Sequence, residues 1–136
     1  MYITDHSTLT GFGYVADKVC TGLGQKYGKD NVFLLGWGFH ATEPINRGSY
    51  LMLPCGNHPH GADVLPRTLQ MVQPEVVITQ NDTRMLLGWW DQMFYPQGKS
   101  QLPCTWINYP VCVPPETLIL GDNKKISELE IGNECI

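Results

Sequence analysis

Short, unbroken apolar segments that alternate with segments of helical period constrain the fold of this 136-residue chain more than any other feature. Strands buried on both faces of a sheet are continuously apolar, whereas a surface helix repeats its apolar residues every three to four positions. The strand-like segments are residues 1–4, 31–37, 50–53, 75–79 and 104–108. The helix-like segments are residues 12–27, 62–72 and 83–94. This alternation predicts an α/β fold, with a parallel sheet of about four strands covered by helices on both faces.

Composition narrows the class of protein. Charged residues make up 16% of the chain, the formal net charge is −4 and no basic stripe is present, so we expect no binding to nucleic acid. No apolar run reaches the ~18 residues of a membrane span, and residues 1–5 lack the pattern of a signal peptide. We therefore expect a cytoplasmic protein without a transmembrane segment. Five cysteines without a Cys-x-x-Cys pair predict free thiols, most of them buried.

The chain changes character near residue 111. Residues 112–136 hold five acidic and two basic side chains, and every histidine and every aromatic residue precedes them. Their apolar core is the short run 117–120. We interpret this change as a boundary between two modules, residues 1–111 and residues 112–136.

Polar turns follow three of the predicted strands, and ligands of parallel sheets bind at such carboxyl ends. In the first turn, Thr10 can cap the following helix, and Gly11 and Gly13 would let a ligand approach backbone N–H groups at its positive end. A plain helix cap with glycines for the turn explains the same residues. The second turn, residues 80–83, either binds sugar hydroxyls or is a capped loop, and the third, residues 108–111, closes the last strand.

The histidines raise the question of a metal site. His58 and His60 form a His-x-His pair three residues after Cys55, and zinc prefers such ligands. A loop with solvated histidines fits the same pattern, and the sequence holds no second cluster of ligands. We therefore predict no metal site, and we interpret His6 and His40 as lone residues.

Five short motifs follow one another along the first module. They lie at residues 10–13 (Thr-Gly-Phe-Gly), 33–38 (Phe-Leu-Leu-Gly-Trp-Gly), 60–66, 74–82 and 106–111 (Trp-Ile-Asn-Tyr-Pro-Val). In order and spacing they resemble the N-terminal domain of group 1 glycosyltransferases, over nearly all of residues 4–111. The resemblance implies the GT-B fold, in which two Rossmann-like domains face each other across a cleft. Residues 1–111 would be an incomplete N-terminal domain.

The same resemblance implies a function and a set of site residues. The N-terminal domain offers the acceptor side of the cleft, and Gly11–Gly13 would border the donor. The donor is a nucleotide-sugar, a substrate, and no cofactor is implied. The C-terminal domain that grips the donor has no counterpart here, so we expect no glycosyl transfer by this chain alone. The implied substrate-binding residues are Gly11, Phe12, Gly13, Asn81, Asp82, Asn108 and Tyr109.

The second module carries a more specific pattern. Residues 112–119 read Cys-Val-Pro-Pro-Glu-Thr-Leu-Ile, and residues 126–132 read Ile-Ser-Glu-Leu-Glu-Ile-Gly. Over all of residues 112–136 the module resembles the N-terminal splicing segment of inteins, which form a β-rich Hint domain. The resemblance implies that the Cys112 thiol attacks the carbonyl of Val111 to form a thioester. A Cys-Val-Pro-Pro turn before an acidic β-hairpin is the alternative.

Together, the two resemblances describe a host glycosyltransferase fragment that carries the start of an intein. The implied partners are the missing C-terminal parts of intein and host, supplied in cis if the gene is truncated or in trans if the intein is split. A 25-residue segment cannot bury enough surface to fold alone, so it would fold on binding. The alternative from another class is a stand-alone α/β binding module without catalytic activity.

Overall fold

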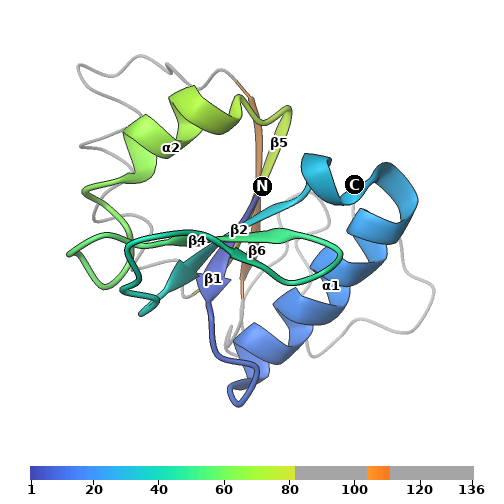
Figure 1. Ribbon diagram of the computed structural model, residues 1–136, viewed down its shortest axis with the longest axis horizontal. Coiled ribbons are helices and arrows are strands. Elements are labelled where there is room, and N and C mark those ends of the chain that lie inside the picture. Colours follow the sequence, from blue (N-terminus) through green and yellow to red (C-terminus); the bar gives the residue numbers. More distant parts are fainter. Residues whose placement is uncertain (82–103, 111–136) are drawn as a thin grey trace, which may run out of the picture.

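One sheet with a helix on each face forms the body of the protein (Figure 1). The computed structural model describes residues 1–81 and 104–110. The strands in these residues are β1 (Tyr2–Asp5), β2 (Phe33–Trp37), β3 (Ile45–Asn46), β4 (Leu51–Pro54), β5 (Val76–Asn81) and β6 (Thr105–Pro110). Their order in the sheet is β3-β4-β2-β1-β5-β6. All neighbouring pairs are parallel except β3 with β4, which is antiparallel.

Helix α1 (Gly11–Tyr27) follows β1. Thr10 caps its first turn, because its side-chain oxygen accepts a hydrogen bond from the backbone N–H of Gly13 at 3.1 Å. The helix ends at Gly28, whose φ of 92° lies in the region that favours glycine. A short 3-10 turn, η1 (Lys29–Asn31), then leads into β2.

Helix α2 (Leu65–Val72) joins β4 to β5. Pro66 lies in its first turn, where the missing backbone N–H removes no helical hydrogen bond. The helix ends at Gln73, which has left-handed backbone angles and donates its N–H to the carbonyl of Leu69 at 2.9 Å. The spacing predicted this helix over residues 62–72, so its true start is three positions later.

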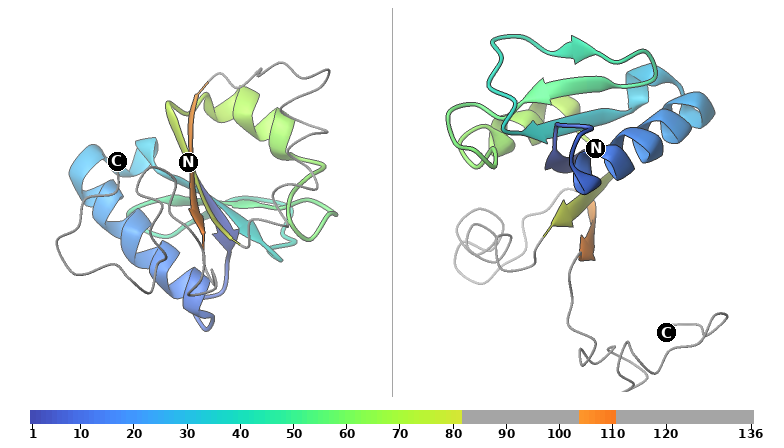
Figure 2. Two further views of the ribbon diagram at one scale, coloured as in Figure 1. Left: turned by 180° about the vertical axis from the view of Figure 1, so that it is seen from behind. Right: turned by 90° about the horizontal axis from the view of Figure 1, so that it is seen from below.

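Two hydrophobic clusters lie on the two faces of the sheet, and α1 and α2 cover opposite faces (Figure 2). Because side chains alternate along a strand, neighbouring residues such as Leu34 and Leu35 belong to different clusters. The cluster under α2 consists of Ile3, Leu35, Trp37, Leu53, Leu65, Leu69 and Val77. The cluster under α1 consists of Tyr2, Ala16, Cys20, Val32, Leu34, Tyr50 and Met52.

Helix α1 packs on the sheet through small residues. Its buried positions are Gly13, Ala16, Cys20 and Gly24. The periodic apolar residues that indicated this helix in the sequence are Phe12, Val15, Val19 and Leu23. Two of them, Val15 and Val19, are 38% and 36% exposed. Small side chains allow a closer approach of the helix to the strands, so the large apolar residues lie on the flank of the contact.

The coarse prediction of an α/β fold is confirmed, but the predicted parallel sheet is wrong in detail. The sheet is mixed, because the exposed two-residue strand β3 runs antiparallel at one edge. A strand this short has no apolar run by which the sequence could reveal it. Strands β5 and β6 also extend further than predicted, through Asn81 and Pro110, so parts of two predicted turns are strand.

Several predictions fall outside the described residues. They are the helix over residues 83–94 and the whole second module, residues 112–136. The site residues Asp82, Val111 and Cys112 fall outside as well. In the part of the chain that the structure describes, no helix is both long and apolar enough to cross a membrane.

Candidate functional site

The strand order defines a topological switch point between β1 and β5. From β1 the chain proceeds to β2 and β4 on one side, and it later returns to β5 and β6 on the other side. In doubly wound sheets the loops that follow two such strands diverge, and a crevice forms outside their carboxyl ends. Ligands of doubly wound sheets bind in such crevices, so this edge is the candidate functional site.

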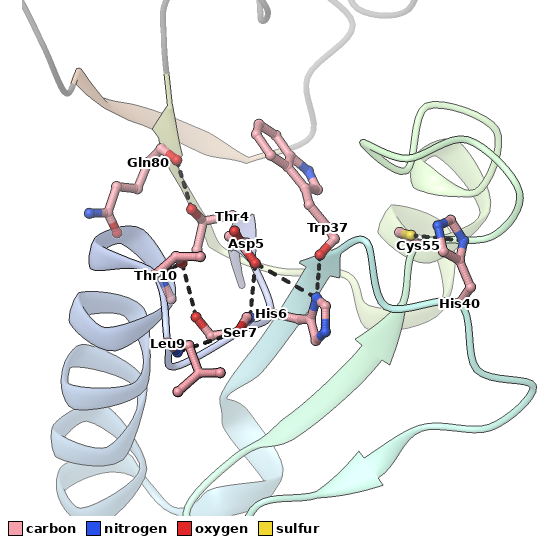
Figure 3. Close-up of polar contacts among 11 residues, drawn as sticks. Thr4, Asp5, His6, Ser7, Leu9, Thr10, Trp37, His40, Cys55 and Gln80 are labelled. Atoms are coloured by element: carbon pink, nitrogen blue, oxygen red, sulfur yellow. Dashed lines mark hydrogen bonds and ion pairs between the residues drawn. The ribbon is translucent and has the colours of Figure 1, made fainter.

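Buried polar side chains connect β1 to β5 just inside this edge (Figure 3). The Thr4 hydroxyl donates to the carbonyl of Gln80 at 2.8 Å. The Tyr2 hydroxyl donates to Oε1 of Gln80 at 2.9 Å, and burial raises the pKa of Tyr2 to about 12, so this hydroxyl keeps its proton. These bonds join β1 to β5 and hold the two strand ends at a fixed spacing.

The turn from β1 into α1 gives its two glycines different roles. A Cβ atom on Gly11 would meet no other atom within 4 Å, and Gly11 is exposed at the start of the helix. A Cβ atom on Gly13 would overlap the backbone carbonyl of Ser7, so Gly13 is needed for packing within the turn. Phe12, between them, is half-buried. Only Gly11 leaves open space for a ligand.

The Thr79 hydroxyl links β5 to β6 near their carboxyl ends. Its hydroxyl accepts a hydrogen bond from Nε1 of Trp106 at 3.1 Å and lies 3.1 Å from Oδ1 of Asn108, to which it donates. The side chain of Asn108 is therefore held on the face of the sheet that carries α2. Asn81 lies on the same face, because it follows Thr79 by two positions, and it is 3% exposed.

The predicted site residues in the described part of the chain share one edge but not one face. Tyr109 pairs with Gln80 in the β5–β6 register, so it lies on the α1 face with the first turn of α1, and it is 53% exposed. Asn81 and Asn108 lie on the opposite face. A ligand in contact with all of them would have to lie across the strand ends.

His6 is a candidate residue that sequence reasoning missed, because a single histidine after a strand carries no recognisable pattern. Its Nδ1 lies 2.6 Å from the carbonyl oxygen of Trp37 and 3.7 Å from a carboxylate oxygen of Asp5 (Figure 3). A carbonyl oxygen can only accept a hydrogen bond, so in the neutral ring Nδ1 carries the hydrogen and Nε2 carries the lone pair. His6 fits here because Gly36 has no side chain; a Cβ atom on Gly36 would lie 2.7 Å from the Cβ of His6. In that tautomer Nε2 can accept a hydrogen bond from a hydroxyl group.

The other histidines are held within loops. His60 lies against the ring of Trp37, with a centroid distance of 4.8 Å, and burial together with His58 lowers its pKa. Nδ1 of His40 lies 2.7 Å from the carbonyl of Gly56 and 3.6 Å from the sulfur of Cys55. Burial raises the pKa of Cys55, so its thiol is not an activated nucleophile. No group of three or more potential metal ligands converges within residues 1–81 and 104–110.

A hollow of about 820 Å³ lies at the opposite, amino edge of the sheet. Its lining includes Met1, Tyr27, Asp30, Val72 and Glu75. None of the predicted site residues lines it. The candidate site lies at the opposite, carboxyl edge of the sheet. We therefore interpret this hollow as a gap between the two helices and the starts of the strands.

Comparison of the chain with protein-family models, with curated proteins and with solved structures finds no match. The features that point to a function are therefore the switch point, the polar residues around it and the two sequence resemblances.

Proposed function

We propose that this chain is the N-terminal part of a GT-B glycosyltransferase, interrupted after Val111 by the first segment of an intein. One observation carries the proposal: β6 ends at Pro110, paired with Asn81 at the carboxyl edge beside the switch point. The splice junction would thus follow directly on a strand end of the ligand-binding edge. An insertion there interrupts the host's cleft, so the host becomes active only after splicing.

In the spliced host, the edge described above would form one side of the cleft. Gly11 leaves room for the donor nucleotide-sugar at the positive end of α1. Asn81, Asp82, Asn108 and Tyr109 would contact the sugars, and Nε2 of His6 would accept a hydrogen bond from a sugar hydroxyl. The second GT-B domain must supply the remaining contacts, because half a cleft cannot align donor and acceptor.

In the intein segment, Cys112 would be the splicing nucleophile. Its sulfur attacks the carbonyl carbon of Val111, the peptide C–N bond breaks, and the amino group of Cys112 takes up the proton released by the thiol. The product is a thioester between Val111 and Cys112. The rearrangement is uphill unless a folded intein polarises the scissile bond, so it requires the complementary intein segment.

Thiol-induced cleavage tests this proposal. With the complementary intein segment supplied in trans, excess thiol should release residues 1–111 with the mass of a Val111 thioester product. Cys112→Ala should abolish the release, because alanine has no group that can take the acyl chain. Cys104→Ala and Cys135→Ala are the matched controls, and they should leave it intact because neither cysteine adjoins the junction.

Cleavage at another bond, or equal cleavage in Cys112→Ala, would reject the splicing role and favour the acidic-hairpin interpretation. The glycosyltransferase half has a separate test. Purified chain alone should show no turnover of nucleotide-sugars. Turnover that is lost on substitution of Asn108 would show that the cleft is complete without a second domain. Specific ligand binding with no partner would instead favour the stand-alone binding module.

A further inference from the structure

A short loop between β4 and α2 lies at the carboxyl end of β2. It consists of residues 57–60, which we call the strap, and Gly56 and Gly61 bound it. Both glycines have positive φ angles, 73° and 77°, in the region that favours glycine. A residue without a side chain also adopts more backbone conformations than any other, so the chain can turn at each end of the strap.

A backbone hydrogen bond and a ring contact join the strap to the end of β2. The backbone N–H of Gly38 donates to the carbonyl of Pro59 at 3.0 Å, and the rings of His60 and Trp37 lie 4.8 Å apart between centroids. Trp37 is 8% exposed, and its indole N–H is buried without a hydrogen-bond partner in the part of the chain that the structure describes. A buried donor without an acceptor destabilises the arrangement that contains it. The closed strap is therefore poised to move, because this N–H gains water as a partner once His60 leaves the Trp37 ring.

The contacts within the strap favour neutral histidine rings. The backbone N–H of His60 donates to Nδ1 of His58 at 3.1 Å, and a protonated Nδ1 has no lone pair with which to accept this bond. The two rings lie 5.6 Å apart between centroids, so two positive charges there would repel each other. Burial, and then the neighbouring His58, lowers the pKa of His60 below its ordinary value of 6.5. A proton on His60 therefore favours an arrangement in which this ring has left Trp37 for water.

The carboxylate of Asp63 contacts the start of the strap. It accepts hydrogen bonds from the backbone N–H groups of Asn57 and His58, at 2.9 Å and 3.2 Å. Its negative charge attracts a protonated His58 ring, and this attraction opposes release of that end of the strap. We therefore assign the response to acid to His60, at the other end of the strap, where burial against Trp37 disfavours the proton.

Other titratable groups of the described residues lie around the ends of the neighbouring strands (Figure 3). Nδ1 of His40 lies 3.6 Å from the sulfur of Cys55, whose thiol keeps its proton because burial raises its pKa. At the end of β1, a carboxylate oxygen of Asp5 lies 3.7 Å from Nδ1 of His6. None of these four groups is a cause of the lowered pKa of His60.

We propose that the strap is a pH-sensitive device, which neutral His60 holds on the end of β2 and which protonation of His60 releases. The closed arrangement is complete above pH 6.5, and it is lost as the pH falls through the lowered pKa of His60. Release uncovers the indole N–H of Trp37 at the carboxyl edge of the sheet, where it can donate to water or to an oxygen atom of a ligand. This device belongs to the folded body of the protein, so it goes beyond the proposed function and does not depend on it.

Nuclear magnetic resonance of the indole N–H groups in the isotope-labelled full chain tests the device. The sequence has four tryptophans, and the signal that disappears in Trp37→Phe belongs to Trp37. A soluble paramagnetic probe broadens the signal of any N–H that solvent reaches. We expect the Trp37 signal to be protected well above pH 6.5 and broadened well below it, with a midpoint under 6.5. The indole N–H of Trp106, which donates to Thr79 at 3.1 Å, should show no such transition.

A matched pair of variants assigns the transition to one histidine. His60→Phe keeps a ring against Trp37 that cannot take a proton, so the Trp37 signal should stay protected over the whole pH range. His40→Gln removes a histidine outside the strap, and it should leave the midpoint of the transition unchanged.

Four outcomes would overturn the proposal. The first is a Trp37 signal whose broadening does not depend on pH, and the second is an undiminished transition in His60→Phe. Loss of the transition in His40→Gln would assign the release to His40 instead. A transition shared by Trp106 would show that the whole protein unfolds in acid, and one that disappears on addition of a chelator would show that the histidines hold a metal ion.

Discussion

The two faces of the sheet are covered in opposite ways. Helix α2 buries large side chains, Leu65 and Leu69, among the apolar residues of the strands. Helix α1 buries glycine, alanine and cysteine instead, and its valines remain half-exposed on the flank. The first contact gains stability from apolar area, whereas the second depends on the close approach of two backbones.

Apolar periodicity therefore identifies a helix but not the side by which the helix packs. The apolar repeat of α2 coincides with its buried face. The apolar repeat of α1 is offset from its buried face by about a quarter turn, because the small residues make the contact. Large apolar residues on a flank are then available for another contact.

The largest expected effect is the difference in stability between two variants, each with one apolar side chain shortened on one of the two helices. Leu69→Ala should lower the free energy of unfolding by about 2–5 kcal/mol, because it leaves a cavity in a packed cluster. Val19→Ala should cost less than about 1 kcal/mol, because its side chain is already 36% exposed. Chemical denaturation of both variants measures the difference, and equal losses would contradict the comparison.

Enlarging the small residues of α1 should have the next largest effect. A Cβ atom on Gly24 would overlap the backbone carbonyl of Ser49, so Gly24→Ala should cost about 1–3 kcal/mol as the helix is forced away from the sheet. Gly22 is the matched control. A Cβ atom there meets nothing within 4 Å, so Gly22→Ala should stabilise the helix by roughly 0.5–1 kcal/mol. Thermal melts that shift in the same direction would refute a close-packed α1.

The smallest expected effect concerns the hydrogen bond that orients α1. Tyr50→Phe keeps the buried ring but removes the bond to Asp17, and it should cost about 1.5 kcal/mol at neutral pH. Burial, and then the bond to Asp17, raises the pKa of Tyr50 to about 12 from 10.0. The neutral phenol is therefore favoured in the folded state. The contribution of Tyr50 to the free energy of unfolding is complete below pH 10.0, and it is lost as the pH rises through about 12.

Denaturation at a series of alkaline pH values tests the predicted direction of this pH dependence. Stability should fall between pH 10 and pH 12 in the unmodified chain, and Tyr50→Phe should make the fall shallower without abolishing it. Tyr2 and Cys20 contribute to the remainder, since burial raises the pKa of each to about 12 as well. A pH profile that is identical in both proteins would show that folding does not raise the pKa of Tyr50.

Much of the fold could be predicted because it follows from local pattern. The run around Leu34–Leu35 is buried on both faces, so it has no other use than a strand of a covered sheet. The start of α1 at Thr10 and Gly11 followed from capping chemistry. The strand β3 could not be predicted, because Ile45 and Asn46 are exposed and are fixed only by their pairing with β4.

The candidate site was only partly predictable for a different reason. Turns after strands indicate an edge, so Gly11, Asn81 and Asn108 were placed at the right end of the sheet. The face on which each side chain lies depends on where its strand stops, and β5 and β6 extend further than their apolar runs. His6 depends on Gly36, thirty positions away, and on the carbonyl of Trp37, and such non-local contacts leave no trace in a single sequence.

The polar bonds between β1 and β5 have a consequence for synthesis of the protein. Tyr2 and Gln80 are separated by 78 positions, and the Thr4 bond spans 76. The central strand β1 is thus synthesised before β2 and β5, the two strands that pair with it. Strand β5 leaves the ribosome much later than β2. A nascent chain can assemble β1, α1, β2 and β4 early, with one side of β1 still unpaired. We expect folding to be slow and to finish only when β5 emerges, since closing so long a loop precedes the contacts that reward it.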